Sequence, residues 1–236
     1  MNIAGLQKMT LLDYPGKVAC TAFLGGCNFR CPFCHNSTLL CASAPEEMTP
    51  EQLLSFLKKR QGLLDGVCIT GGEPTLSPDL GQLLEQIKAL GFSVKLDTNG
   101  TNPRMLKELV EAGLIDYVAM DIKNSPRGYP QTAGIPGLAM EKIEESMAFL
   151  LTGSLEYEFR TTVVEELHSD ADFTEIGLWL QKLAPDHKAK RFFLQFYRDT
   201  ESVLLPGLHA PNPEKLHHFA RLLRPFVDSV EIRGVE

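Results

Sequence analysis

The chain carries the run VACTAFL at residues 18–24, followed directly by GGCNFRCPFCHN at residues 25–36. Branched and aromatic side chains in the first run predict a strand from Val18 to Leu24. The second run places Cys27, Cys31 and Cys34 in a C-x3-C-x2-C spacing. Thiolates bind soft metals, and cysteines this close on one loop can surround a single metal centre. The sequence therefore predicts a strand that ends in a metal-binding loop.

The number of clustered cysteines indicates what kind of centre they hold. A structural zinc ion normally has four protein ligands, and a cubane iron–sulfur cluster usually takes four cysteines. Three ligands with no second C-x2-C pair suggest a centre with one position open for chemistry. Cys41 is the alternative fourth ligand, and a closed site would instead make the chain an electron carrier. Cys20 and Cys68 lie in apolar runs and are predicted to be buried thiols.

CNFRCPFC, with the aromatic Phe33 before its last cysteine, resembles the signature of the radical S-adenosylmethionine superfamily. The resemblance implies a [4Fe-4S] cluster held by Cys27, Cys31 and Cys34. It also implies that the fourth iron binds the amine and carboxylate of S-adenosyl-L-methionine. His35 and Asn36 complete a CHN that is similar to the signature of activating enzymes within that superfamily.

Length and composition favour one ordinary globular domain. The chain has 236 residues, and we expect a single core domain over 1–236, with an N-terminal extension at 1–17 and a cluster-binding loop at 25–36. A net charge of −7 without a basic cluster argues against nucleic-acid binding. The first residues lack a signal-peptide pattern, and no apolar run approaches the roughly 18 residues of a membrane span. We therefore expect a cytoplasmic protein with no membrane partner.

Strands and helices alternate along the rest of the chain. Residues 2–17 contain polar and turn residues, and 124–137 are expected to form a loop. The alternation favours a parallel sheet with helices outside, and about six units are too few for a closed eight-stranded barrel. The fold class is therefore α/β, a partial, side-open (β/α)6 TIM-type barrel, which the resemblance also implies. The expected helices are 51–60 (capped by Thr49 and Pro50), 79–90, 103–112, 138–151, 172–183 and 213–223, and the expected strands are 67–70, 93–96, 116–122, 156–164, 191–196 and 229–232.

Several polar motifs fall at the carboxyl ends of these strands. They are the cysteine loop, GGEP (Gly71, Gly72, Glu73 and Pro74), DTNG (Asp97, Thr98, Asn99 and Gly100), MDIK (with Asp121 and Lys123) and Gln195. Parallel strands of a barrel share one mouth at these ends, where active sites are built. Glycines let a ligand approach the backbone, and the resemblance implies that GGEP contacts the methionyl amine. A tight turn is the structural alternative for GGEP and for DTNG.

DTNG and the D-x-K element resemble the activating enzymes of glycyl radical enzymes. The resemblance implies that Asp97, Thr98 and Asn99 line the S-adenosylmethionine site. It places Asp121 beside a bound monovalent cation and Lys123 beside the substrate carboxylate. Oxygen ligands from Asp97, Thr98 and Asp121 suit a hard cation. A salt bridge is the structural alternative for Lys123.

Two further side chains are predicted to bind the cofactor. Arg160 lies among apolar neighbours in its strand and needs a partner. It pairs either with the methionyl carboxylate, as a comparable arginine does in the family, or with an outward acidic group. Gln195 lies near the place where activating enzymes carry a histidine.

GLQKMTLLDYPGKV at residues 5–18 and FLGGCNFRCPFCHN at 23–36 are most similar to activating proteins of anaerobic ribonucleoside-triphosphate reductase. The resemblance implies reductive cleavage of S-adenosylmethionine and formation of a glycyl radical on a partner enzyme. It also implies a flavodoxin- or ferredoxin-type electron donor. One alternative is a radical S-adenosylmethionine enzyme that acts on a small molecule or peptide. The other is a non-catalytic iron–sulfur electron-transfer module.

Overall fold

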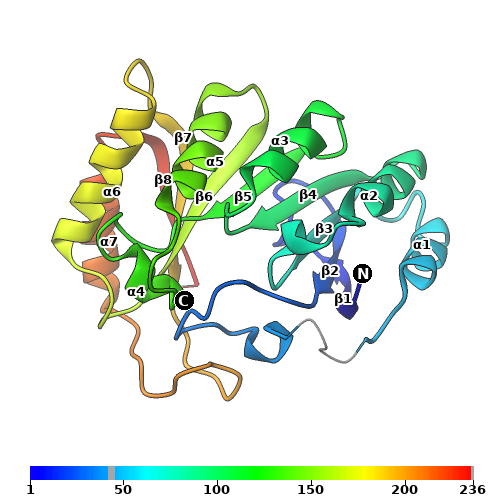
Figure 1. Cartoon of the computed structure of the whole chain (residues 1–236), viewed down its shortest axis with the longest axis horizontal. Coiled ribbons are helices and arrows are strands. Elements are labelled where there is room, and N and C mark those ends of the chain that lie inside the picture. The colour runs from blue at the N-terminus through cyan, green and yellow to red at the C-terminus, as the bar shows by residue number, and fades with distance from the viewer. Residues whose placement is uncertain (42–45, 235–236) are drawn as a thin grey trace. The chain divides into compact units, whose positions relative to one another are not determined.

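The computed structural model describes residues 1–41 and 46–234. Its strands follow one another in chain order across one eight-stranded sheet (Figure 1). Because β1 and β8 are the two edges, the sheet is open, which confirms the predicted α/β class. The strands are β1 (Ile3–Thr10), β2 (Ala19–Leu24), β3 (Gly66–Gly71), β4 (Ser93–Thr98), β5 (Tyr117–Asp121), β6 (Glu156–Val163), β7 (Ala189–Phe196) and β8 (Val227–Arg233).

The helices lie close to the expected positions. They are α1 (Pro50–Lys58), α2 (Leu80–Ala89), α3 (Pro103–Glu111), α4 (Tyr129–Ala133), α5 (Met140–Thr152), α6 (Asp170–Leu183) and α7 (Pro213–Leu223), with short 3-10 helices η1 (Ser37–Leu39) and η2 (Pro74–Leu76). Within residues 1–41 and 46–234, no helix has the length and apolar character needed to span a membrane.

Two elements differ from expectation. β1 lies in the segment that looked like polar and turn residues, and α4 lies inside the expected loop at 124–137. β1 pairs antiparallel with β2 at the sheet edge, and three of its eight residues are exposed. An edge strand with one face exposed to solvent needs few apolar residues, so the hydrophobic pattern that would identify it in the sequence is weak. α4 has only five residues and depends on tertiary contacts rather than on periodicity.

The register of the sheet places two predicted motifs side by side. β2 pairs parallel with β3, and Leu24 at the end of β2 is the partner of Gly71 at the end of β3. The cysteine loop follows Leu24, and GGEP begins at Gly71. Both motifs therefore start from neighbouring strand ends, as the parallel arrangement predicted.

The chain divides into two compact units. The first comprises Met1–Asn28, Thr38–Thr98 and Asn102–Ala119, and the second comprises Phe29–Ser37, Asn99–Thr101 and Met120–Glu236. That residues 1–236 form a single core domain stays a prediction, since the division into two compact units does not test it.

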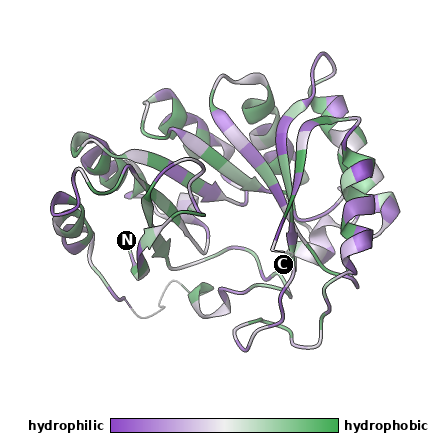
Figure 2. Cartoon of the chain, turned by 180° about the vertical axis from the view of Figure 1, so that it is seen from behind, coloured by the Kyte–Doolittle hydropathy of each residue, from purple (hydrophilic) through white to green (hydrophobic). Residues whose placement is uncertain are grey.

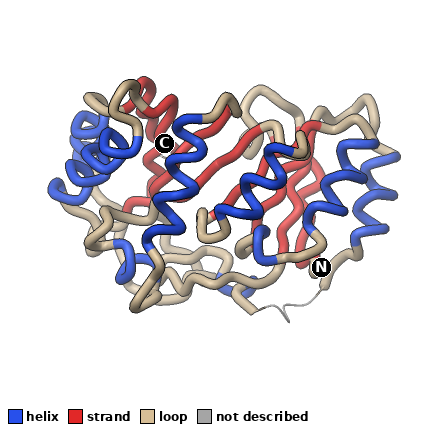
Figure 3. Tube along the Cα trace, turned by 45° about the horizontal axis from the view of Figure 1, so that its top comes forward, coloured by secondary structure: helices blue, strands red, loops and turns tan. Residues whose placement is uncertain are grey.

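In the first unit, helices cover one side of the strands. Figure 3 shows α1, α2 and α3 alongside β2, β3 and β4. α2 buries Leu80, Leu83, Leu84 and Ile87 on one face, a spacing that matches the helical repeat. Each such side chain stabilises the fold by about 1.5–3 kcal/mol relative to leaving it in water. Thr49 forms the predicted cap of α1, accepting from the N–H of Gln52 at 3.3 Å.

In the second unit, aromatic side chains form much of the core. Phe173 on α6 stacks on Phe219 of α7, with ring centroids 4.3 Å apart. Figure 2 shows that polar and apolar residues alternate along the helices and the strands of this unit. The fully buried Glu158 on β6 accepts from the guanidinium of Arg233 on β8 at 2.9 and 3.1 Å, which compensates its charge.

Candidate active site

Cys27 opens the cysteine loop in the first unit. Its backbone N–H donates to the carbonyl of Leu40 at 3.2 Å, and the N–H of Gly26 donates to the carbonyl of Leu39 at 2.8 Å. The chain on either side of the loop is thus joined by backbone hydrogen bonds. These bonds fix the backbone that carries the Cys27 thiol at the carboxyl end of β2.

Cys31 and Cys34 belong to the second unit, where α4 supports them. The N–H of Arg30 donates to the carbonyl of Ala133 at 2.9 Å, and the N–H of Cys34 donates to the carbonyl of Cys31 at 3.1 Å. Gly134 ends α4 in a left-handed conformation, and a Cβ there would lie 2.1 Å from the carbonyl oxygen of Arg30. Such close approach requires glycine. α4 is therefore a support of the cysteine loop that the sequence pattern missed.

Thiolates are the ligands that a soft metal centre takes, and Cys27, Cys31 and Cys34 stay the predicted ligands of the cluster. None of the six cysteines, all of which are described, is in a disulfide. Cys41 is exposed, and Cys20 and Cys68 are buried as predicted. Among the described residues, no three His, Cys, Asp or Glu side chains converge on one metal ion. A [4Fe-4S] cluster binds each thiolate through a different iron, so its ligands are spaced more widely than those of one ion.

Glu73 is a buried carboxylate at the carboxyl end of β3, 1% exposed. Its Oε1 accepts from the N–H and the hydroxyl of Thr75 at 3.1 and 2.5 Å and from the hydroxyl of Thr98 at 2.8 Å. Glu73 also caps the short helix η2, which begins at Pro74. The structure thus joins two motifs, GGEP and DTNG, by a direct hydrogen bond.

Gly71 and Gly72 bring GGEP against the cysteine loop. Gly71 has a φ of +116°, and a Cβ on Gly72 would lie 2.0 Å from the carbonyl oxygen of Gly26. That oxygen accepts from the N–H of Glu73 at 2.8 Å. The two glycines are therefore needed for contact between backbones at this corner of the first unit.

Asp97 is paired with a buried lysine that the sequence analysis did not single out. Lys95 lies two residues earlier on β4, and its ammonium contacts the Asp97 carboxylate. The Sγ of Cys68 on β3 lies 3.9 Å from the Lys95 nitrogen and 3.7 Å from the Asp97 carboxylate. A lysine inside the apolar run SVKL was the available signal, because a buried charge needs a partner.

Asn99 and Gly100 belong to the second unit and form a local turn. The side-chain oxygen of Asn99 accepts from the N–H and hydroxyl of Thr101 at 3.0 and 2.7 Å. The hydroxyl of Ser146 on α5 donates to the carbonyl of Gly100 at 2.7 Å. The turn predicted as the structural alternative for DTNG is thus present, and a cofactor role for Asn99 stays a prediction.

Asp121, Lys123 and Arg160 form one network in the second unit. Lys123 and Arg160 contact opposite oxygens of the Asp121 carboxylate, at 2.9 and 3.0 Å. Burial alone would lower the pKa of Lys123, but the charges of Asp121 and Cys31 raise it. Lys123 also lies 5.9 Å from the ring centroid of Phe33 in the cysteine loop. The structure therefore gathers four predicted site residues, with Arg160 facing Asp121.

Gln195 lies on β7 beside the strand that carries Arg160. It pairs with Thr162 of β6, whose hydroxyl is 3.4 Å from its side-chain oxygen, and Arg160 pairs with Phe193 two residues earlier. Because residues two apart on a strand share a face, Gln195 and Arg160 lie on the same face of the sheet.

His35 shows a contact that the sequence did not indicate. Its ring stacks on Tyr197, with centroids 5.5 Å apart, and its Nε2 lies 2.6 Å from the carbonyl of Arg198. The N–H of Leu205 donates to the carbonyl of Pro32 at 2.8 Å. The segment 197–205, which follows β7, thus holds the second half of the cysteine loop.

His168 is a buried histidine, 3% exposed, whose ring lies next to the backbone of Lys123. Its Nδ1 accepts from the N–H of Val164 at 3.1 Å, and its Nε2 lies 2.9 Å from the carbonyl of Lys123. These partners suit the neutral ring with its proton on Nε2. Burial lowers the pKa of His168, more than its backbone hydrogen bonds raise it.

We expect His168 to make stability fall in mild acid. The unfolded histidine, with a pKa near 6.5, takes up a proton that the folded ring resists, so the free energy of unfolding decreases as pH drops from about 6.5 toward the lower folded pKa. Denaturant unfolding between pH 7.5 and 5.5 measures this slope. His168→Gln should flatten it, whereas the exposed His217→Gln should keep it. An unchanged slope in His168→Gln would contradict this assignment.

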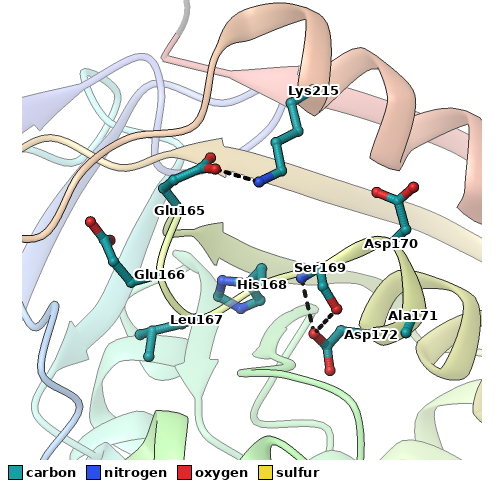
Figure 4. Close-up of a pocket in the computed structure, with 9 residues that line it drawn as sticks. All are labelled: Glu165, Glu166, Leu167, His168, Ser169, Asp170, Ala171, Asp172 and Lys215. Carbon is teal, nitrogen blue, oxygen red and sulfur yellow. Dashed lines mark hydrogen bonds and ion pairs between the residues drawn. The ribbon is translucent and has the colours of Figure 1, made fainter.

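A depression of about 560 Å³ lies beside His168, between the residues that follow β6 and the start of α7. Figure 4 shows that acidic side chains dominate its lining. Glu165 pairs with Lys215 at 2.5 Å, and Asp172 accepts from Ser169 and Ser125. Because these charges already have partners within the chain, we assign no ligand to the depression.

Residues 21–150 match the Radical SAM superfamily. The chain is 30% identical to a protein of Methanocaldococcus jannaschii provisionally named a glycyl-radical enzyme activating enzyme, over 99% of this chain and 96% of that one. It is 32% identical to the pyruvate formate-lyase-activating enzyme of Clostridium pasteurianum, over 52% of each chain.

The fold also resembles a solved structure. A domain of the pyruvate-formate lyase-activating enzyme from Bacteroides vulgatus superposes with a TM-score of 0.58 at 20% identity, covering 72% of this chain and 99% of that domain. At this identity the likeness concerns the fold alone.

Proposed function

Because the chain belongs to the radical S-adenosylmethionine superfamily, we propose that it is an activating enzyme that generates a glycyl radical on a partner enzyme. The observation that carries this proposal is the similarity to the Methanocaldococcus jannaschii protein that has this provisional name, which covers 99% of this chain and 96% of that one. The partner that the motifs at residues 5–18 and 23–36 favour is anaerobic ribonucleoside-triphosphate reductase.

The superfamily implies a [4Fe-4S] cluster and S-adenosylmethionine as cofactors. Cys27, Cys31 and Cys34 would hold the cluster, since they supply soft thiolate ligands on one loop. When bound, the two cofactors supply a carbon-centred radical through one-electron cleavage of the sulfonium. A flavodoxin- or ferredoxin-type protein would supply the electron.

The chain's own residues would bind and orient S-adenosylmethionine. Glu73 offers a buried negative charge to the methionyl amine, and its three hydrogen-bond donors hold the carboxylate in one orientation. Arg160 and Lys123 offer positive charge to carboxylates, and Asp121 fixes both of them. Positioning of this kind is what the protein contributes to such chemistry. The remaining residues proposed to contact the cofactor are Phe33, Gly71, Gly72, Pro74, Asp97, Thr98, Asn99 and Gln195.

We expect Glu73→Gln to weaken S-adenosylmethionine binding by about 10- to 100-fold, since a hydrogen bond to a charged group contributes roughly 1.5–3 kcal/mol. Equilibrium binding to the anaerobically reconstituted protein measures the effect. Glu85→Gln, on the exposed face of α2, is the matched control and should leave binding unchanged. Equal affinities for the two variants would remove Glu73 from the site.

The function is tested by electron paramagnetic resonance. The reconstituted chain, S-adenosylmethionine and a reductant are incubated anaerobically with anaerobic ribonucleoside-triphosphate reductase. A glycyl radical should form on the reductase and be absent when its radical glycine is replaced by alanine. Formation of 5′-deoxyadenosine without a radical on any glycyl radical enzyme would instead favour a small-molecule or peptide substrate. An intact cluster without cleavage of S-adenosylmethionine would favour an electron-transfer module.

A further inference from the structure

Lys95 is a charged side chain in an almost fully buried position. It lies on β4 opposite Cys68 of β3, and its side chain is 1% exposed. Its ammonium contacts the Asp97 carboxylate, which is 13% exposed. Removing an ammonium from water is costly unless a carboxylate compensates it. Asp97 is the compensating group that the described contacts of Lys95 provide.

This pairing changes what Asp97 can bind. Hard cations are held by several oxygen ligands whose negative charge attracts them. A carboxylate already neutralised by an ammonium offers little net charge. A metal ion at Asp97 would also face the Lys95 ammonium at short range, where like charges repel strongly in a dry site.

The other two side chains expected to bind a cation are also engaged within their own units. The hydroxyl of Thr98 donates to Glu73 at 2.8 Å in the first unit. In the second unit, the two oxygens of Asp121 contact Lys123 and Arg160. Each side chain predicted to bind the cation therefore already interacts with a charged group of the chain: the two aspartates with cationic side chains, and the threonine with a carboxylate. The cation that the resemblance implies does not fit this donor set.

We propose that Lys95 is the resident cation of this chain and occupies the place at Asp97 that a monovalent ion would take. Lys95 is then a positioning residue, since its ammonium holds Asp97 and the start of DTNG in the orientation that the cofactor meets. The proposal rests on the S-adenosylmethionine site of the proposed function.

The first test compares monovalent ions. The reconstituted protein is moved into potassium, sodium or choline chloride at equal ionic strength, and S-adenosylmethionine affinity is measured in each. Affinity and unfolding temperature should be the same in all three, because the ammonium of Lys95 already occupies the place at Asp97. Choline is the control, since this bulky ion cannot enter a metal site. Affinity that rises tenfold with potassium or sodium alone would overturn the proposal and restore a bound metal ion.

The second test removes the ammonium. S-adenosylmethionine should bind to Lys95→Ala at least about tenfold more weakly than to the wild-type chain. Ethylammonium or potassium should restore part of the lost affinity, and choline should restore none. Lys88→Ala is the matched control, because it removes a surface lysine paired with Asp116 at 2.7 Å and should show no recovery. Lys95→Ala with full affinity, or with a loss that no small cation restores, would overturn the proposal.

Unfolding separates this inference from the proposed function. The unfolding temperature of Lys95→Ala without S-adenosylmethionine should rise with ethylammonium more than that of the wild-type chain. If S-adenosylmethionine is not cleaved at all, this shift still reports on Lys95.

If Lys95→Ala does not fold, a double variant with Lys95→Met and Asp97→Asn removes both charges at similar volume. Replacement of a buried ion pair by neutral groups is often tolerated. That double variant should show no response to ethylammonium, because the carboxylate that would attract the added cation is gone, and a clear rise in its unfolding temperature with ethylammonium would count against the pairing.

Discussion

Replacing Cys27, Cys31 or Cys34 with alanine is expected to abolish 5′-deoxyadenosine formation. Each thiolate would bind one iron of the cluster, and loss of any one leaves that iron without its protein ligand. Iron and sulfide content after anaerobic reconstitution should fall in the same variants. The effect should be complete because no other thiol lies on this loop.

Cys41→Ala is the matched control for these variants. Cys41 is exposed, and it is the fourth ligand that an electron carrier would need. We expect Cys41→Ala to keep both its cluster and its activity. Loss of the cluster in this variant, with no cleavage by the wild-type chain, would favour the electron-transfer module.

Gly72→Ala is expected to reduce 5′-deoxyadenosine formation by about 100-fold. The new Cβ would lie 2.0 Å from the carbonyl oxygen of Gly26, and a backbone oxygen has no rotamer through which to move aside. Relief requires GGEP and the start of the cysteine loop to separate. Misplacement of catalytic groups by about 1 Å can cost about 100-fold in rate. Overpacking of this kind also lowers the free energy of unfolding by about 1–3 kcal/mol.

Gly81→Ala controls for the added methyl group. Gly81 lies in α2, where a Cβ would meet Leu109 at an ordinary 3.5 Å. Alanine is the better helix former by about 1 kcal/mol, so this variant should be at least as stable as the wild-type chain and fully active. Thermal unfolding and the cleavage assay compare the two variants. Equal activity of Gly72→Ala and Gly81→Ala would show that the contact with Gly26 is not needed.

The features that depend on neighbouring residues could be predicted from the sequence. The spacing of Cys27, Cys31 and Cys34 is local, and so is the alternation of apolar runs that predicts β3 or α2. The cap at Thr49 was predicted for the same reason, because its partner Gln52 is three residues away. The α/β class followed from this alternation and is confirmed by the sheet order.

Only the tertiary structure decided which groups face one another. Arg160 and Asp121 are 39 residues apart, so nothing local could choose between a cofactor and an acidic partner for the arginine. Lys95 was not singled out from the sequence, and only its contact with Asp97 in the structure showed that the two side chains share one face of β4. α4 and the segment 197–205 support the cysteine loop through backbone bonds from distant parts of the chain. The periodicity of a sequence indicates which residues of each segment are buried and which are exposed to water. The contacts between distant residues depend instead on how the segments pack against each other.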